Sequence, residues 1–199
     1  MPEAKTKGQA TREKIIQAAI SLFNTRGLKN TSLNDIIHAT GVKKGNLYFH
    51  FASKDDMCRE IILAAKENYF DFLKQEMTGE TPLEQLFNLL DAVSAYHSRK
   101  NFVGGCIFGN TALEMADTDS NFTDLILDIF NEWISLLADL VEQAQRKDEI
   151  NPDLDPDAMA RHIVATAEGG IMMARLSKRP KDLDDCLNSL KTWLSQKLH

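Results

Sequence analysis

The sequence predicts an all-α protein of about nine helices, with a small N-terminal domain and a larger helical body. Apolar residues recur with the three-to-four-residue period of an amphipathic helix, and no stretch alternates with the two-residue period of a strand. Capping residues, glycines and prolines divide the chain into segments of ordinary helix length. The composition is 43% hydrophobic and 26% charged, which is typical of a globular protein with its own core.

Local signals place the N-terminal helices in order. The first is expected at about residues 10–26. Ser32 caps a short second helix whose third residue is Asp35, a capping-box-like arrangement, and Gly41 ends that helix in a left-handed turn. One or two further turns of helix begin near Lys43.

Six more helices follow in the body. They are expected at about 53–77, 82–100, 110–117, 121–147, 156–176 and 182–197. Residues 101–109, NFVGGCIFG, contain three glycines and interrupt the helical pattern. Asp155 and Pro156 are suited to the cap and the first position of the helix that they open. We therefore expect a helical body broken by one glycine-rich segment.

The charge is unevenly divided along the chain. Residues 1–54 carry nine Lys and Arg against three Asp and Glu, a net charge of +6, whereas residues 55–199 carry −12. A basic module joined to an acidic body indicates a polyanion-binding segment attached to a domain with another task. The alternative is an ordinary solvated surface. We place the domain boundary between the two parts.

Other features concern the compartment and the class of protein. No segment has the apolar length of a membrane span, and the first residues, MPEAKTKGQATREK, lack the apolar core of a signal peptide. Cys58, Cys106 and Cys186 are too few and too far apart for a disulfide framework. Neither the histidines nor the glycines form a metal-binding or nucleotide-binding motif. We expect a cytoplasmic protein that needs no membrane, metal or cofactor.

Residues 31–50 have the pattern of a helix, a glycine-containing turn and a second helix. This is the helix-turn-helix plan, in which the second helix enters the major groove of DNA. On a helix from Lys43, Leu47 and Phe51 turn inward. The outward side chains are Lys43, Lys44, Asn46, Tyr48 and His50.

The chemistry of these positions suits DNA. Lysine attracts phosphates or guanine acceptors, and asparagine can bridge adenine. Gly45 has no side chain, so the helix backbone can approach the duplex closely. Ser32 and Lys54 stand at helix N-termini, where free backbone N–H groups favour a phosphate.

These residues carry a resemblance to a known family. Over about residues 10–57, without a gap, the chain resembles the DNA-binding domain of the TetR family of bacterial transcriptional regulators. The most specific part is G-V-x-x-G-x-L-Y-x-H-F-x-S-K, from Gly41 to Lys54. The body is similar to the family in length, helicity and layout. GGCIFGNTALEMAD, at 104–117, is also similar to a Gly-Cys…Glu segment found in a subset of the family.

The resemblance implies a ligand-responsive regulator, expected to be a repressor that binds a palindromic operator as a homodimer. Residues 1–54 would bind double-stranded DNA, and residues 55–199 would bind a small-molecule effector and form the dimer through the last two helices. Tyr48 and Lys54, with Thr31 or Ser32, would hold phosphates, whereas the other outward residues would face bases or the groove edge. The predicted DNA-binding residues are Thr31, Ser32, Lys43, Lys44, Gly45, Asn46, Tyr48, His50 and Lys54.

The effector site is less specific in the sequence. Candidate wall residues are Tyr69, Phe102, Cys106, Phe108, Trp133 and Met172, although residues of these types are more often plain core. Cys106 leaves an alternative open: a thiol-based sensor of oxidants or electrophiles within the same DNA-binding framework. That alternative requires a lowered thiol pKa and access to solvent.

Two features of the last helices point to helix pairing. Gly169 and Gly170 lie within a strong helical pattern, where each costs about 1 kcal/mol relative to alanine. This favours a close helix–helix approach across the dimer interface, with a local kink or a pocket wall as the alternatives. The last helix carries a leucine stripe that a partner could cover. The stripe comprises Leu183, Leu187, Leu190 and Leu194.

Two other classes of function explain fewer of these sequence features than a DNA-binding regulator does. An enzyme acting through Cys106 would need a general base, and the sequence offers none beside it, so we expect no catalysis. A protein-binding helical scaffold would leave unexplained both the +6 charge of residues 1–54 and the intact motif from Gly41 to Lys54.

Overall fold

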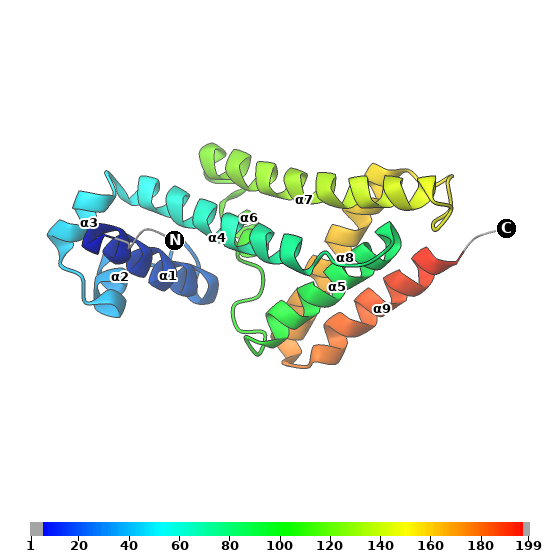
Figure 1. Cartoon of the computed structure of the whole chain (residues 1–199). Helices are drawn as coiled ribbons and strands as arrows, with labels where there is room; N and C mark the ends of the chain where they lie inside the picture. The colour runs from blue at the N-terminus through cyan, green and yellow to red at the C-terminus, as the bar shows by residue number, and fades with distance from the viewer. Residues whose placement is uncertain (1–5, 197–199) are drawn as a thin grey trace.

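The computed structural model describes residues 6–196, and in this range the chain forms nine helices and no strand. α1 (Lys7–Arg26), α2 (Leu33–Thr40) and α3 (Lys44–His50) make one end of an elongated molecule, and α4 (Lys54–Glu76) runs from that end into the body (Figure 1). The body is completed by α5 (Pro82–Ser98), α6 (Ile107–Met115), α7 (Ser120–Arg146), α8 (Pro156–Ser177) and α9 (Pro180–Ser195). The predicted all-α class is confirmed.

Caps define the helices of the N-terminal end. Thr6 forms a capping box with Gln9, so α1 begins three residues before the predicted start. Ser32 and Asp35 cap α2 reciprocally, as expected, and Gly41 ends it in the left-handed conformation with φ of 67°. Each of these signals involves residues at most four positions apart.

The glycine-rich segment is shorter than predicted. α6 begins at Ile107, three residues before the expected start, because the Cys106 side chain caps it by accepting the Gly109 N–H at 3.4 Å. The last helix begins at Pro180, where proline suits the first position, and ends at Ser195. Residue 197, the predicted end, lies outside the described residues.

One hydrophobic core runs through both ends of the molecule. α4 joins them, since it packs against both α1 and α5. Ile61 and Leu73, near its two ends, are fully buried, and burial of a side chain of this size contributes about 1.5–3 kcal/mol. None of the helices in residues 6–196 is long and apolar enough to cross a membrane.

The leucine stripe of α9 and Gly170 pack within the chain, which corrects their expected place at a dimer interface, whereas the expectation for Gly169 stays a prediction. The four leucines of the α9 stripe are at most 4% exposed, because the chain's own helices cover them. A Cβ on Gly170 would lie 2.7 Å from Leu183 Cδ1, so this glycine serves the packing of α8 on α9 within one chain. A Cβ on Gly169 would meet nothing within 4 Å. The outer side of α8 instead exposes Met172, Met173 and Leu176.

Candidate functional site

The recognition helix α3 separates an inner from an outer side. Leu47 is 1% exposed and anchors the helix on the core, as does Phe51 directly after it. Lys44, Gly45 and Asn46 are exposed on the outer side, and nothing lies within 4 Å of the position that a Cβ on Gly45 would take. Polar groups and bare backbone are therefore presented together, as direct reading of base edges requires.

Phe49 is an outer-side residue that the sequence reasoning missed. Its side chain is 84% exposed, and it points almost opposite to Leu47, because residues two apart on a helix are about 200° apart. His50 is half-buried, with its ring 5.2 Å from that of Phe49 and 6.4 Å from that of Phe51. The expectation that His50 faces fully outward is corrected. Helical spacing from the inward Leu47 is the signal that could have identified Phe49 in the sequence.

The candidate phosphate-binding groups surround this outer side. Tyr48 is 46% exposed, and Lys44 Nζ lies 5.9 Å from the centre of its ring. Lys43 is exposed at the N-cap of α3, and Lys54 is the first residue of α4. These cations therefore stand beside two helix N-termini, where backbone N–H groups are free to face an anion.

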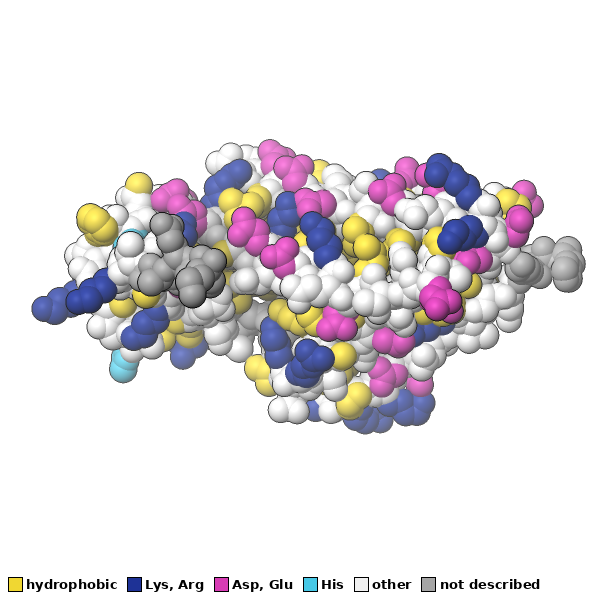
Figure 2. Space-filling model, viewed as in Figure 1, with side chains coloured by type: hydrophobic (Ala, Val, Ile, Leu, Met, Phe, Trp, Pro, Cys, Tyr) yellow, Lys and Arg dark blue, Asp and Glu magenta, His cyan; other side chains and the backbone are white. Residues whose placement is uncertain are grey.

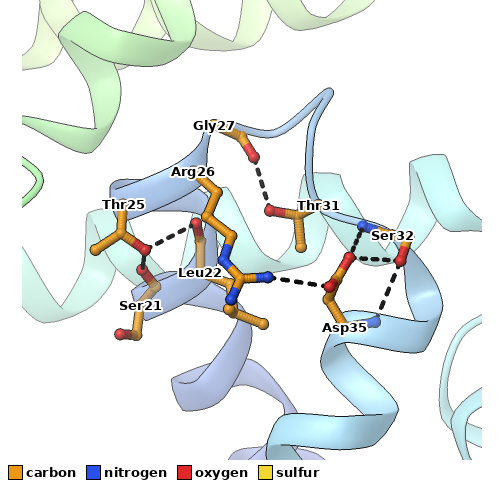
Figure 3. Close-up of polar contacts among 8 residues, drawn as sticks. All are labelled: Ser21, Leu22, Thr25, Arg26, Gly27, Thr31, Ser32 and Asp35. Atoms are coloured by element: carbon orange, nitrogen blue, oxygen red, sulfur yellow. Dashed lines mark hydrogen bonds and ion pairs between the residues drawn. The ribbon is translucent and has the colours of Figure 1, made fainter.

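Thr31 and Ser32 lie differently, although they are neighbours in the sequence (Figure 3). Thr31 is fully buried, and its hydroxyl donates to the Gly27 carbonyl at 2.7 Å, so it is not placed to hold a phosphate. Ser32 is exposed at the N-cap of α2. Of the two predicted alternatives, only Ser32 is exposed, at the N-terminus of α2, and its hydroxyl and N–H both donate to Asp35.

Asp35 organises the turn that leads into α2. Its carboxylate accepts from the Ser32 hydroxyl and from the Ser32 N–H at 2.8 Å, and it pairs with Arg26 at 3.0 Å (Figure 3). Hydrogen bonds from Ser32, with help from the Arg26 charge, lower the pKa of Asp35 below its usual value. The carboxylate thus remains charged as a fixed part of the motif.

Charge also distinguishes the two ends on the surface. Figure 2 shows lysine and arginine side chains projecting at the α1–α3 end, whereas on the body acidic side chains are spread among basic ones. This arrangement matches the division of net charge along the chain. A basic end favours approach to a polyanion, and an acidic body disfavours contact elsewhere.

A cavity of about 210 Å³ lies where the N-terminal end meets the body. α1, α4, α5 and the segment leading into α6 all line it. The lining residues are Gln17, Ile20, Asn24, Ala65, Asn68, Tyr69, Tyr96, His97, Lys100, Gly105, Cys106, Ile107 and Phe108. The cavity therefore has walls from both predicted domains.

Of the polar side chains that line this cavity, one carries a full charge and one is a neutral imidazole. Lys100 is the only lysine, arginine or acidic residue in the lining, and its Nζ lies 3.8 Å from the centre of the Tyr96 ring. His97 is 3% exposed, and burial, with the nearby Lys100, lowers its pKa to about 4. The imidazole is therefore neutral at physiological pH and can donate or accept a hydrogen bond.

The predicted effector residues are only partly brought together. Tyr69, Cys106 and Phe108 line the 210 Å³ cavity. Phe102 is 2% exposed and lies outside it in the core, while Trp133 packs edge-on behind Tyr69, with ring centres 5.9 Å apart. Sequence reasoning missed the α1 wall, because nothing in the first helix distinguishes a cavity residue from a surface residue.

A second cavity of about 340 Å³ shares Gly105 and Cys106 with the first as lining residues. Met172 lines this one, together with Glu168 from the same helix. Glu168 Oε1 is buried and has no hydrogen-bond partner in residues 6–196. Burial raises the pKa of the Glu168 carboxyl above its usual value.

The surroundings of Cys106 do not support a thiol sensor. Burial and the neighbouring Glu168 carboxyl raise the pKa of the Cys106 thiol well above its usual value. A sensor needs the opposite shift, so that thiolate is present near neutral pH. Arg175, which could have supplied a positive charge, instead donates to Asn110 Oδ1 at 2.8 Å. Cys106 is a helix cap and a wall shared by the two cavities.

Family models match both ends of the chain. Residues 15–61 match the model described as bacterial regulatory proteins, tetR family, and residues 82–190 match the tetracyclin repressor-like C-terminal domain. The transcriptional regulator AcuR of Cereibacter sphaeroides is 27% identical over 184 residues, which cover 92% of this chain and 84% of that protein. The HTH-type transcriptional repressor DhaR of a Mycobacterium species is 24% identical, with 88% of each chain covered.

Solved structures show the same arrangement over nearly the whole length. A TetR transcriptional regulator from Chloroflexus aurantiacus superimposes with a TM-score of 0.89 at 33% identity, covering 96% of this chain and 97% of that one. The regulatory protein TetR from Rhodobacter sphaeroides gives a TM-score of 0.86 at 26% identity, covering 92% and 97%. The similarity therefore extends to both ends and to their placement.

Proposed function

The chain belongs to the tetR family of bacterial regulatory proteins, and from this premise we propose that it is a repressor controlled through the cavity between its two ends. It is a transcriptional regulator with a DNA-binding helix-turn-helix and a ligand-binding C-terminal domain, and its relatives are regulators rather than enzymes. Our proposal adds a cytoplasmic homodimer on a palindromic operator, with residues 1–54 binding DNA and residues 55–199 binding effector and partner.

At the operator, α3 would enter the major groove. Lys44, Gly45, Asn46 and Phe49 would face base edges, because they occupy the outer side of α3. The surrounding groups would hold phosphates and fix the position of the helix. These are Ser32, Lys43, Tyr48 and Lys54.

The observation that carries the effector proposal is the shared wall of the 210 Å³ cavity. Gln17, Ile20 and Asn24 follow one another at three- and four-residue spacing, so they share one side of α1. A molecule in the cavity would touch this side and the body at once. Its binding would then favour one placement of α1 over another, which is what linkage between effector and DNA requires.

The lining also suggests the chemical class of the effector. Lys100, whose side chain is exposed, supplies its one full charge, Gln17 and Asn68 add carboxamides to the lining, and no acidic side chain lines the cavity. The rest is largely aromatic and aliphatic. A small organic acid, with an anionic head at Lys100 and an apolar body against Phe108, would pair with these groups.

A matched panel of small molecules tests this proposal. Operator DNA is selected from random-sequence DNA with the wild-type protein, and its release is followed by fluorescence anisotropy with small carboxylic acids, their primary amides and the corresponding amines. We expect the acids to release DNA best. Lys100→Met should raise the acid concentration that is needed about tenfold, the effect of losing about 1.4 kcal/mol.

Lys147→Met is the control, because Lys147 is exposed at the far end of α7 and should leave the response unchanged. Equal release by acids, amides and amines would refute an anionic effector but not an effector cavity. To test the cavity, Ile20→Trp fills it. An unaltered response of that variant to every active compound would refute the site itself.

A further inference from the structure

The Glu114 carboxylate, near the end of α6, holds the backbone of the DNA-binding end. Oε2 accepts the Leu28 N–H at 2.8 Å and Oε1 accepts the Lys29 N–H at 2.5 Å. Both donors lie between α1 and α2, where no helix supplies them with an acceptor. Glu114 therefore binds the turn from which the helix-turn-helix starts, across 86 residues of sequence.

Lys29 makes the contact reciprocal. Its Nζ donates to the Glu114 carbonyl at 2.7 Å and to Thr118 Oγ1 at 2.8 Å. Gly27 leaves room for the carboxylate: its φ is 88°, and a Cβ there would come within 3.0 Å of Glu114 Oε2. We call this group the α6 clamp, formed by Glu114 and Thr118 with Leu28 and Lys29.

The other end of α6 reaches both cavities. Ile107 and Phe108, its first residues, line the 210 Å³ cavity, and Gly109 lines the 340 Å³ cavity. Asn110 joins this end to α1 through Asn24 Oδ1 at 3.3 Å. One nine-residue helix thus connects the cavity walls to the turn that precedes α2.

We propose that Glu114 is a positioning residue, which fixes how the helix-turn-helix is oriented on the body and thereby sets the half-site spacing that the dimer accepts. It does not touch DNA. A two-fold dimer reads two half-sites at a spacing fixed by the distance between its recognition helices, so a loosened attachment would accept several spacings. This inference rests on the proposed dimer with two half-sites. When the cavity walls move, α6 would transmit that movement to the α6 clamp.

Operators of altered spacing provide a readout that a merely stabilising contact would not change. The selected operator is compared with versions that have one base pair added or removed between the half-sites. Wild type should lose affinity about tenfold or more for the altered versions, because one base pair shifts and rotates one half-site relative to the other. Glu114→Ala should lose about threefold or less, and Glu114→Gln, which keeps one acceptor oxygen, should fall between them.

Glu149→Gln is the matched control. Glu149 also accepts a backbone N–H from a distant helix start, that of Leu83 at 2.9 Å, but entirely within the body. It should alter thermal stability without altering spacing discrimination. Amide hydrogen exchange supplies a second measurement: the Leu28 and Lys29 amides should exchange faster in Glu114→Ala and at the wild-type rate in Glu149→Gln.

The outcomes separate the two proposals. Wild-type protein that tolerates every spacing would refute two fixed half-sites and, with them, the role of the clamp. Strong discrimination by wild type and by Glu114→Ala alike would refute the clamp alone. An equal loss of discrimination in Glu149→Gln would also overturn it, by showing a general effect of stability.

Discussion

The DNA-binding end and the body are held in different ways. α2 and α3 contain only eight and seven residues, and helices this short are marginal without help from caps and neighbours. Ser32, Asp35 and Gly41 cap α2 from within the segment, whereas α3 has no side-chain cap and is anchored on the core by Leu47. α7 and α8, by contrast, contain 27 and 22 residues and are held by packing on one another. The DNA-binding end is thus locally specified but attached to the body by few elements, which suits a part that must be repositioned.

The two ends also differ in how far their ionisable groups are buried. Among residues 6–54 the basic side chains are exposed or at most partly buried, and Lys43 and Lys44 stand where they can meet phosphates. In the body, burial shifts the pKa of His97 down and those of Tyr69, Cys106 and Glu168 up. All four shifts favour the neutral form. Among the residues that line the smaller cavity, the ammonium of Lys100 is therefore the one full charge, whereas Arg175 lines the larger one.

The largest expected effect tests packing in the body. Gly170→Leu places a side chain where a Cβ alone would lie 2.7 Å from Leu183 Cδ1 and 3.3 Å from Leu183 Cα. We expect the free energy of unfolding to fall by at least about 3 kcal/mol, measured by urea denaturation. Gly169→Ala is the control: it meets nothing within 4 Å and should stabilise by up to about 1 kcal/mol. Equal effects of the two variants would contradict the assignment of Gly170 to packing within the chain.

The next prediction concerns the neutral imidazole of His97. Because its folded pKa of about 4 lies below the unfolded value of 6.5, only the unfolded chain binds this proton between these pH values. Wild type should therefore lose stability as the pH falls from 6.5 to 4, by about 3 kcal/mol from this group. His97→Asn should lack that part of the loss when the unfolding free energy is measured at several pH values.

His38→Asn serves as the control for that measurement, because His38 is exposed at the DNA-binding end. The unfolding free energy of the His38→Asn variant should change with pH as that of wild type does. A His97→Asn curve parallel to wild type from pH 7 to pH 4 would show that this imidazole titrates normally and is not buried as the structure places it.

The smallest expected effect examines the exposed ring of Phe49. Beside Gly45, it offers an apolar contact for the 5-methyl group of a thymine. Replacing such a thymine by uracil in the operator should weaken wild-type binding by about 0.8 kcal/mol, the value of one methyl-sized group. Phe49→Ala should bind both operators equally. Lys54→Ala should bind each more weakly but keep the difference between them, since a phosphate contact carries no base information.

An exposed apolar residue outside α3 provides the control for Phe49→Ala, since it tests the general effect of removing apolar surface. Leu113→Ala changes a side chain that is 89% exposed on α6, and it should keep the wild-type preference for thymine. If no thymine-to-uracil change in the half-site affected wild type, Phe49 would not read methyl groups.

The sequence alone determined the helical class, the helix-turn-helix and the family to which it belongs. The capping pair Ser32 and Asp35, the left-handed Gly41 and the inward Leu47 were all predicted correctly. The reason is physical: caps, turns and amphipathic periods depend on residues within about four positions of one another. Such signals can be read from the order of residues without knowledge of the fold.

Only the tertiary structure decided which residues share a wall or a contact. Thr31 is buried whereas Ser32 is not, and Tyr69 lines a cavity that Phe102 does not reach. Glu114 meets the turn before α2 although 86 residues separate it from Leu28. An amphipathic period says that a helix has an apolar side, but it does not say which helix covers that side. That choice is made by packing the whole set of helices together, and the cavities and the α6 clamp arise from it.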